Sequence, residues 1–321
     1  MGAEMQALYV DKGILSIKKN LSVPERAKDE ALIRVVVAGI CATDLEIVKG
    51  YLGFRGVPGH EFVGLVEEAD DEQWIGKKVV GSINLGCGHC KVCRGAGPEH
   101  CPQRKVLGIL GRDGAFAEYL VLPLVNLFEI PEGVSDQEAV FVEPLAAAMR
   151  ICDQVAIHPS DRIAVVGPGR LGILIAQILG RTGAEVVLLG RRRESIHLAE
   201  TLDLHCGEVG EIEDNSFDFV VEATGNPGGF AQSLRIVRPR GTLILKSTFA
   251  GRSELDLTKV VVAEINIVGS RCGPFAPALR LLATGDIRVK ELIEEEYPLS
   301  EGRAAFTHAA RPGVKKVLLR P

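Results

Sequence analysis

The pattern of apolar and polar residues changes character near residue 161. Between about residues 33 and 125 the apolar residues form short β-rich runs, which Gly, Pro and Cys separate. These runs predict strands over residues 31–37, 62–67, 78–80 and 116–121. We therefore expect this part of the chain to form a compact antiparallel or barrel-like β domain.

Beyond residue 161, short apolar runs alternate with segments whose apolar residues recur every three or four positions. This alternation is typical of an α/β fold with a parallel, doubly wound sheet and right-handed crossovers. Strands are predicted over residues 162–167, 185–189, 217–223, 241–245 and 265–269, and helices over 170–182, 194–202 and 230–237. The tail predicts a helix over 277–283 and a strand over 315–319, and we expect it to return to the first domain.

A glycine-rich turn joins the first of these strands to the first helix. In Gly167-Pro-Gly169-Arg170-Leu171-Gly172, the first glycine permits a tight turn and the second lets the backbone approach a pyrophosphate. The third lets the helix pack closely on the strand, and the helix N-terminus favours phosphate. Because the motif closes a strand and opens an amphipathic helix, it predicts a dinucleotide site and not merely a flexible connection.

The end of the second strand indicates which dinucleotide binds. In NAD enzymes this strand ends with Asp or Glu, which holds the ribose 2′-hydroxyl. Here it ends with Gly190, and three guanidinium groups follow at Arg191, Arg192 and Arg193. Cations at the start of a helix oppose its dipole unless an anion is bound. We therefore expect NADP(H), with its 2′-phosphate held by these arginines.

Four cysteines, Cys87, Cys90, Cys93 and Cys101, lie close together in the first domain. The chain shows no secretion signal, so we expect a reducing compartment, where such a set is more typical of a zinc site than of disulfides or free thiols. Four thiolates fill a tetrahedral site and leave no position for water. The zinc bound here is therefore expected to be structural.

A second set of candidate ligands is dispersed along the chain. Cys41 lies in Gly-Ile-Cys-Ala-Thr, His60 and Glu61 in Pro-Gly-His-Glu-Phe, and Glu143 in Val-Glu-Pro-Leu. With the four-cysteine loop and the glycine-rich turn, these segments resemble the zinc-dependent medium-chain dehydrogenases of the alcohol dehydrogenase family. The resemblance covers essentially the whole chain and is strongest to the polyol, threonine and glucose dehydrogenase branch.

The resemblance implies a two-domain architecture. A GroES-like, β-rich catalytic domain is expected over residues 1–146, with a structural zinc lobe at about 84–103. A Rossmann domain that binds NADP is expected over 147–271. Residues 272–321 are expected to return to the catalytic domain.

The resemblance also implies that Cys41, His60, Glu61 and Glu143 surround a catalytic zinc. If the thiolate and both carboxylates bound together, the centre would carry a net charge of about −1 and would be a poorer Lewis acid. We therefore expect only one carboxylate to bind at a time. Which of the two binds at rest stays open.

Two further residues are expected to carry protons. Thr43 resembles the hydroxyl relay of the family, which accepts the alcohol proton. Glu46 stands where many members have histidine; either the proton leaves through Glu46, or Glu46 is a solvated surface residue and water carries the proton. Further cofactor contacts are expected where Rossmann strands end, at Thr224, Gly225, Gly269, Ser270 and Arg271.

Composition limits the partners and the location. Hydrophobic residues make up 46% of the chain and charged residues 25%, as in ordinary globular proteins. A net charge of −5 gives no electrostatic case for binding nucleic acid or an anionic membrane, and no apolar stretch is long enough to span one. We expect a cytoplasmic protein, and by resemblance a homodimer or homotetramer.

Together these features predict an enzyme with two zinc ions per chain, one catalytic and one structural. It would move a hydride between NADP(H) and a small hydroxyl substrate, such as an alcohol, a polyol or a sugar. Two alternatives are a zinc-free NADPH-dependent enone or quinone reductase of the same fold, and a non-catalytic NADPH-binding zinc protein. The Cys41, His60 and Glu61 set argues against the first, and Thr43 against the second.

Overall fold

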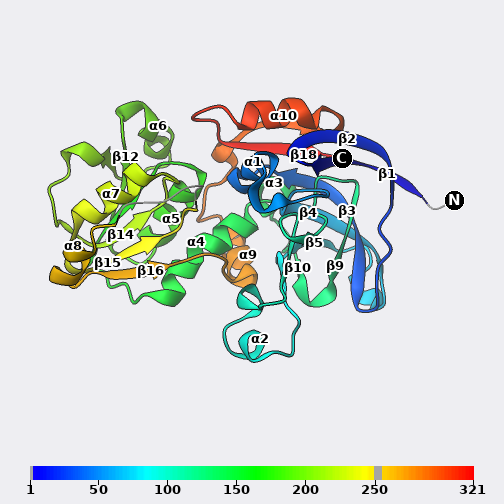
Figure 1. The fold of residues 1–321 in the computed structure, drawn as a ribbon, viewed down its shortest axis with the longest axis horizontal. Helices are drawn as coiled ribbons and strands as arrows, with labels where there is room; N and C mark the ends of the chain where they lie inside the picture. Colours follow the sequence, from blue (N-terminus) through cyan, green and yellow to red (C-terminus); the bar gives the residue numbers. More distant parts are fainter. Residues whose placement is uncertain (1–2, 249–254) are drawn as a thin grey trace. The chain divides into compact units, whose positions relative to one another are not determined.

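The computed structural model describes residues 3–248 and 255–321, which form two compact units (Figure 1). Unit 1 comprises Met1–Glu143 and Phe275–Pro321, and unit 2 comprises Pro144–Pro274. The C-terminal segment therefore folds with the N-terminal part of the chain. Among the described residues, no helix is long and apolar enough to cross a membrane.

Unit 1 is built around a seven-stranded sheet with β3 (Glu30–Gly39) at its centre. β3 pairs antiparallel with β4 (Glu61–Ala69), β9 (Tyr119–Pro123) and β18 (Lys316–Arg320). Its apolar side chains, Ile33 among them, lie in the main hydrophobic core of the unit. The sheet is completed by β5 (Lys78–Gly81), β10 (Leu127–Glu129) and β17 (Ile293–Pro298).

Two smaller sheets complete the strands of unit 1. β1 (Glu4–Asp11) and β2 (Ile14–Ser22) form a hairpin, whose turn residues Lys12 and Gly13 both have positive φ, as a tight hairpin turn requires. The other small sheet is formed by β6 (Asn84–Leu85), β7 (Lys105–Leu107) and β8 (Gly111–Arg112). The helices of unit 1 are α1 (Ala42–Val48), α2 (Lys91–Gly95), α3 (Asp136–Ala139), α9 (Phe275–Ala283) and α10 (Gly302–Ala309).

Unit 2 is a six-stranded sheet in which every strand pair is parallel, as predicted. Its order is β13-β12-β11-β14-β15-β16, so β12 and β13 lie on one side of β11 and the three later strands lie on the other, and the order reverses at β11. The strands are β11 (Arg162–Val166), β12 (Glu185–Gly190), β13 (Cys206–Glu208), β14 (Phe217–Glu222), β15 (Val237–Leu245) and β16 (Asn266–Gly269). The helices are α4 (Val142–Gln154), whose first two residues belong to unit 1, α5 (Arg170–Gly180), α6 (Arg193–Thr201), α7 (Pro227–Ile236) and α8 (Leu257–Val262).

The strand predicted over residues 116–121 starts later than expected. β9 begins at Tyr119, and the backbone N–H groups of residues 114–116 bond to the carbonyls of residues 57–59. The C-terminal tail also holds a strand and a helix that the apolar pattern did not predict, β17 and α10. Both contact β18 (Figure 1).

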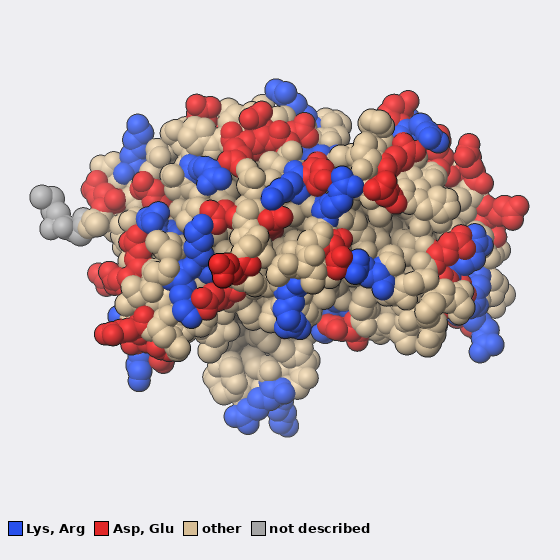
Figure 2. All heavy atoms as spheres, turned by 180° about the vertical axis from the view of Figure 1, so that it is seen from behind, with Lys and Arg blue, Asp and Glu red and all other residues tan. Residues whose placement is uncertain are grey.

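Acidic and basic side chains are interspersed over the face of the molecule in Figure 2. That face shows no continuous basic surface.

Candidate catalytic metal centre and nucleotide site

The ladder between β3 and β4 brings the dispersed candidate ligands together. Because the two strands are antiparallel, the residue that ends β3, Gly39, pairs with the residue that starts β4, Glu61. Cys41 follows two residues after Gly39, as the N-cap of α1, and His60 directly precedes β4. Residues distant in sequence thereby lie at one edge of the sheet.

The ligand atoms of Cys41, His60 and Glu61 all lie within 4.8 Å of one another. His60 and Glu61 are buried, and Cys41 is half-buried. One thiol, one imidazole and one carboxylate are donors that zinc accepts, at bond lengths of about 2.0–2.3 Å. The residues present therefore fit a zinc ion with little adjustment.

Asp44 lies behind two of these ligands and is completely buried. Its Oδ2 accepts a hydrogen bond of 2.7 Å from the backbone N–H of Cys41. Its Oδ1 lies 3.3 Å from Nδ1 of His60, although the angle is too poor for a hydrogen bond. A small rotation of the imidazole would let Nδ1–H donate to Asp44 and direct Nε2 at a metal, which is the usual arrangement for a ligating histidine.

The surroundings of His60 favour its protonated form while no metal is bound. Burial alone would lower the pKa of His60, but the Asp44 carboxylate and then Cys41 outweigh it and raise the pKa well above the ordinary value. Because zinc binds only the neutral imidazole, protons compete with it below that raised pKa. Zinc binding is therefore expected to weaken as the pH falls.

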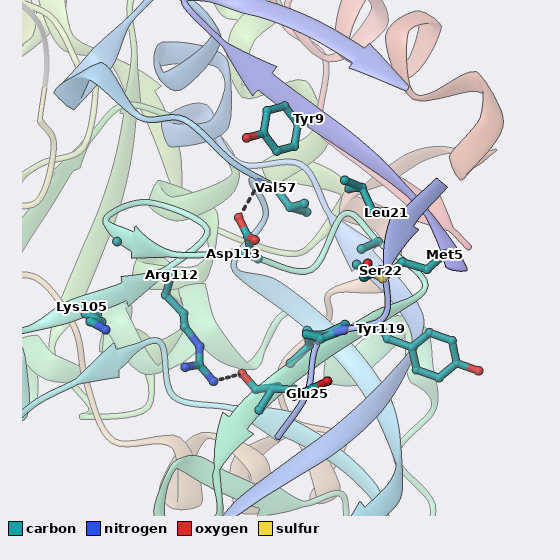
Figure 3. A pocket seen from close by; sticks show the side chains of 16 residues that line it. Met5, Tyr9, Leu21, Ser22, Glu25, Val57, Lys105, Arg112, Asp113 and Tyr119 are labelled. Carbon is teal, nitrogen blue, oxygen red and sulfur yellow. Dashed lines mark hydrogen bonds between the residues drawn. The ribbon is translucent and has the colours of Figure 1, made fainter. Parts of the chain in front are cut away.

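The segment that carries His60 is held by a second loop. Backbone N–H groups of residues 114–116 donate to the carbonyls of residues 57–59 over 2.7 to 3.0 Å. The carboxylate of Asp113 accepts from the N–H of Val57 at 2.8 Å, a bond visible in Figure 3. These bonds fix the backbone immediately before His60. The pocket of about 360 Å³ in the same figure is lined by none of the predicted ligands.

Thr43, Glu46 and Glu143 have different positions relative to this cluster. The hydroxyl of Thr43 lies 3.9 Å from the sulfur of Cys41. Glu46 is partly exposed and accepts a hydrogen bond of 2.8 Å from Lys49 at the surface. Glu143 lies in the first turn of α4 and does not join the group of clustered ligand atoms among the described residues.

The four cysteines of the lobe form a second cluster, whose sulfur atoms also lie within 4.8 Å of one another. The sulfurs of Cys87 and Cys93 are 3.9 Å apart, as are those of Cys90 and Cys101. Backbone N–H groups of His89 and Cys90 lower the pKa of Cys87 to about 6, which favours its thiolate. This set fits a closed tetrahedral zinc site.

In unit 2, the predicted glycine-rich turn follows β11 at the point where the strand order reverses. Gly167 has a φ of +114°, which favours glycine. A Cβ on Gly172 would lie 1.8 Å from the carbonyl oxygen of Gly167, so no side chain fits there. Gly169 caps α5, and Arg170 and Leu171 begin it, so the N-terminus of the helix, which favours anions, lies directly after the turn.

The residues after β12 lead into α6 and include the three arginines predicted to bind a 2′-phosphate. Gly190 ends the strand, and a Cβ there would meet the side chains of Ser195 and Ile196 at 2.4 and 2.6 Å. The Arg193 guanidinium pairs with Glu200 at 2.9 Å. Among the described residues, the exposed side chains of Arg191 and Arg192 have no hydrogen-bond or ion-pair partner.

A buried glutamate organises the loop after β14. Glu222 is 1% exposed and accepts hydrogen bonds from the N–H of Thr224 at 2.7 Å and from its hydroxyl at 2.5 Å. It also accepts from the hydroxyl of Ser247 at 2.6 Å, and Ser247 in turn accepts from the N–H of Gly225. The Thr224 hydroxyl is therefore used within the loop, and the loop itself is fixed.

A buried lysine holds the segment after β16. Lys246 directly follows β15 and donates to the hydroxyl of Ser270 at 3.1 Å and to the carbonyl of Arg271 at 3.0 Å. It also donates to the carbonyl of Ala147 at 2.5 Å. Gly269, at the end of β16, accepts from Gln154. The predicted cofactor segments after β14 and β16 are thus each fixed by a buried charged residue.

Sequence reasoning missed two buried lysines, Lys246 and Lys316, the second of which is the first residue of β18 and lies beside the metal cluster. Lys316 is 2% exposed and contacts the carboxylate of Glu61. Each lysine adjoins an otherwise apolar strand, Leu243-Ile-Leu-Lys246 or Lys316-Val-Leu-Leu. A charge at the end of a buried strand is the signal that could have identified them.

Comparison with known proteins identifies the family. Residues 27–132 match the alcohol dehydrogenase GroES-like domain, and residues 171–284 match the zinc-binding dehydrogenase domain. The chain is 30% identical to D-arabinitol dehydrogenase 1 of Uromyces fabae, over 99% of this chain and 98% of that protein.

Solved structures agree with this assignment. A putative zinc-binding dehydrogenase of Sinorhizobium meliloti 1021 bound to NADP superimposes with a TM-score of 0.90 at 28% identity, over 99% of this chain and all of that one. An Escherichia coli CFT073 alcohol dehydrogenase complexed with NADH superimposes with a TM-score of 0.91 at 26% identity, over the whole of both chains. The chain therefore belongs to the zinc-binding, medium-chain alcohol dehydrogenase family of oxidoreductases, with a GroES-like and a Rossmann unit.

Proposed function

We propose that this protein is an NADP(H)-dependent dehydrogenase that holds a catalytic and a structural zinc ion and acts on a small alcohol, polyol or sugar. The observation that carries the proposal is the cluster of Cys41, His60 and Glu61, with buried Asp44 behind it. A structural or binding protein needs no such buried ligand set. The four-cysteine cluster supports the second zinc ion.

The residues of the cluster have separate roles in the proposed reaction. Cys41 and His60 would hold the zinc with one carboxylate, from Glu61 or Glu143, and Asp44 would orient His60. A zinc ion held there supplies a Lewis acid that lowers the pKa of a substrate hydroxyl. The hydroxyl of Thr43, which lies 3.9 Å from the sulfur of Cys41, would accept the proton of the substrate hydroxyl.

We propose that Glu46 is a surface residue and that water carries the proton to solvent. Its ion pair with Lys49, in which both side chains are exposed by more than a third, supports this role. Glu46→Gln should therefore change kcat by less than about threefold, with an unaltered pH profile. The control is Thr43→Val, which removes the relay hydroxyl and should lower kcat by about 10²-fold or more. A loss for Glu46→Gln that matches Thr43→Val would place Glu46 on the proton path.

The proposed cofactor and the proposed substrate class are supported by different observations. The exposed guanidiniums of Arg191 and Arg192, which have no partner within residues 3–248 and 255–321, and the absence of a carboxylate at Gly190 support NADP(H). The Sinorhizobium structure contains NADP and the Escherichia structure NADH, so the fold accommodates both. A polyol substrate is supported by the likeness to D-arabinitol dehydrogenase 1 and by Glu143.

The test of the proposed function is a screen for NADP⁺ reduction by alcohols, polyols, aldoses and threonine, combined with metal analysis. Two zinc ions per chain and turnover of at least one CH–OH substrate class are the expected results. One zinc ion per chain without turnover would favour the alternative of a non-catalytic NADPH-binding protein. NADPH oxidation by enones, independent of zinc, would favour the reductase alternative.

We further propose that the protein acts in the cytoplasm as a homodimer or homotetramer. Support for assembly comes from the edge strand β16, whose Ile267 is 37% exposed, and from the neighbouring helix α8. Val261 and Val262 of that helix are 73% and 77% exposed. An uncovered apolar edge strand is a typical site for pairing with a second copy. Sedimentation of the purified chain would measure the assembly.

A further inference from the structure

A buried ion pair forms one wall of the metal cluster. Lys316 comes from β18, near the C-terminus, and its ammonium group contacts Oε2 of Glu61. The side chains are only 2% and 1% exposed, so water does not screen the pair. The lysine thus meets one of the three clustered ligands and not a distant surface acid.

The backbone around the pair leaves it room. A Cβ on Gly39 would lie 2.6 Å from Oε2 of Glu61 and 3.1 Å from Cδ of Lys316, so only glycine fits there without displacement. The ammonium also lies 5.7 Å from the centre of the Phe141 ring. Pairing between β3 and β18, with Gly39 opposite Leu318, brings the C-terminal strand to this position.

A buried ion pair is weak evidence for stability. The cost of removing two charges from water offsets most of their attraction, and an apolar pair of similar volume often stabilises a protein equally well. A stability role therefore gives little reason for this pair. The position of the pair beside Cys41 and His60 indicates a role at the metal site instead.

We propose that Lys316 is a positioning residue that holds Glu61 as a displaceable, charge-compensated neighbour of the zinc and keeps it from becoming a tight ligand. The proposal rests on the proposed zinc-dependent function. One oxygen of Glu61 is held by the ammonium, so this carboxylate can approach the metal only by sharing its charge with Lys316. The residue acts through Glu61 and touches neither substrate nor cofactor in this role.

Charge counting shows what the lysine changes. Zn²⁺ with the Cys41 thiolate and the carboxylates of Glu61 and Glu143 would be a centre with a net charge of about −1. The ammonium of Lys316 brings the group to about zero. Both carboxylates can then remain near the metal and exchange as substrate enters, while the centre keeps its strength as a Lewis acid.

The test measures metal binding directly and does not depend on activity. Lys316→Met should release Glu61 to the metal and remove a nearby positive charge. The Kd for the zinc ion at the Cys41, His60 and Glu61 site, measured by competition with a chelator, should therefore fall by about tenfold or more. Co²⁺ can be added to the catalytic site of protein that retains only its structural zinc. In the variant this Co²⁺ should show weaker visible d–d absorption than in the wild type, because its coordination number rises.

Two variants serve as controls. Lys316→Arg keeps the charge and should keep the wild-type affinity and spectrum. Lys315→Met removes the adjacent lysine, whose N–H bonds to Glu294, and should change neither. In a Glu61→Gln background, Lys316→Met should tighten zinc binding much less than it does alone, because no carboxylate is released and only the loss of the positive charge remains.

The outcomes separate the inference from the proposed function. A Lys316→Met protein with unchanged or weaker zinc binding and an unchanged Co²⁺ spectrum would overturn the positioning role, even if the wild type holds two zinc ions and turns over substrate. A wild type that binds only one zinc ion would overturn the proposed function itself. Because Lys316→Met removes the ammonium that pairs with Glu61 in metal-free protein, the Glu61→Gln/Lys316→Met double variant, in which both charges are absent, provides the folded comparison.

Discussion

Replacing His60 with alanine is expected to lower kcat/KM by at least about 10³-fold, since a metal ion contributes several kcal/mol to stabilising charge in the transition state. The same change should reduce the zinc content from two ions per chain to one. His60 is buried beside Cys41 and Glu61, and removing its ring leaves only two of the three clustered ligands. Kinetics with the best substrate of the screen and metal analysis of the purified protein measure both effects.

The effect should be confined to the metal centre. His60 belongs to unit 1, and the predicted nucleotide residues all belong to unit 2, so binding of NADPH, followed by fluorescence, should stay within about twofold of the wild type. His158→Ala, which removes an exposed histidine of unit 2, is the matched control and should retain both zinc ions and full activity. A His60→Ala protein that keeps two zinc ions and more than a tenth of the activity would contradict the assigned metal centre.

The parts of the fold that sequence predicts well are those in which short-range patterns and function coincide. The parallel strands of unit 2 follow from apolar runs such as Arg162–Val166, which is buried except for its first residue. The turn at Gly167 and Gly172 is recognisable because its backbone excludes any side chain. The four cysteines are recognisable because ligands of one metal must be close in space, and here they are also close in sequence.

The parts that sequence predicts poorly depend on contacts between distant segments. β2 has no buried residue, so its apolar pattern is too weak to predict the N-terminal hairpin. Lys316 lies 255 residues from Glu61, and only the pairing of β18 with β3 brings the two together. The spacing of residues along the chain carries no information on such a pair.

The choice of nucleotide illustrates the same distinction. In the sequence, Gly190 stands where NAD enzymes have an acidic residue. The structure adds that the start of α6 fills the space beside Gly190 with Ser195 and Ile196, so an acidic side chain could not be accommodated without displacing the helix. Gly190→Asp is therefore expected to disturb the packing of α6 in addition to any effect on the choice between NADP(H) and NAD(H).

Replacing Arg191 and Arg192 together with alanine should raise the KM for NADP⁺ by about 10²-fold or more and leave the KM for NAD⁺ within about threefold. Each guanidinium can supply charge-assisted hydrogen bonds to a 2′-phosphate, worth about 1.5–3 kcal/mol. Both side chains are exposed and have no partner among the described residues, so no existing ion pair offsets this gain. Steady-state kinetics with both cofactors measure the difference.

Two comparisons make this prediction specific to the 2′-phosphate. Arg240→Ala removes an exposed arginine of the same unit, which pairs with Glu264, and should alter neither KM. Arg193→Ala should have a smaller effect than the double change, because that guanidinium is already paired with Glu200. Inhibition by 2′-AMP should weaken in parallel with NADP⁺ binding, whereas inhibition by AMP should not. Equal losses for NADP⁺ and NAD⁺ would mean that the arginines only support the fold of α6 and that another part of unit 2 selects the cofactor.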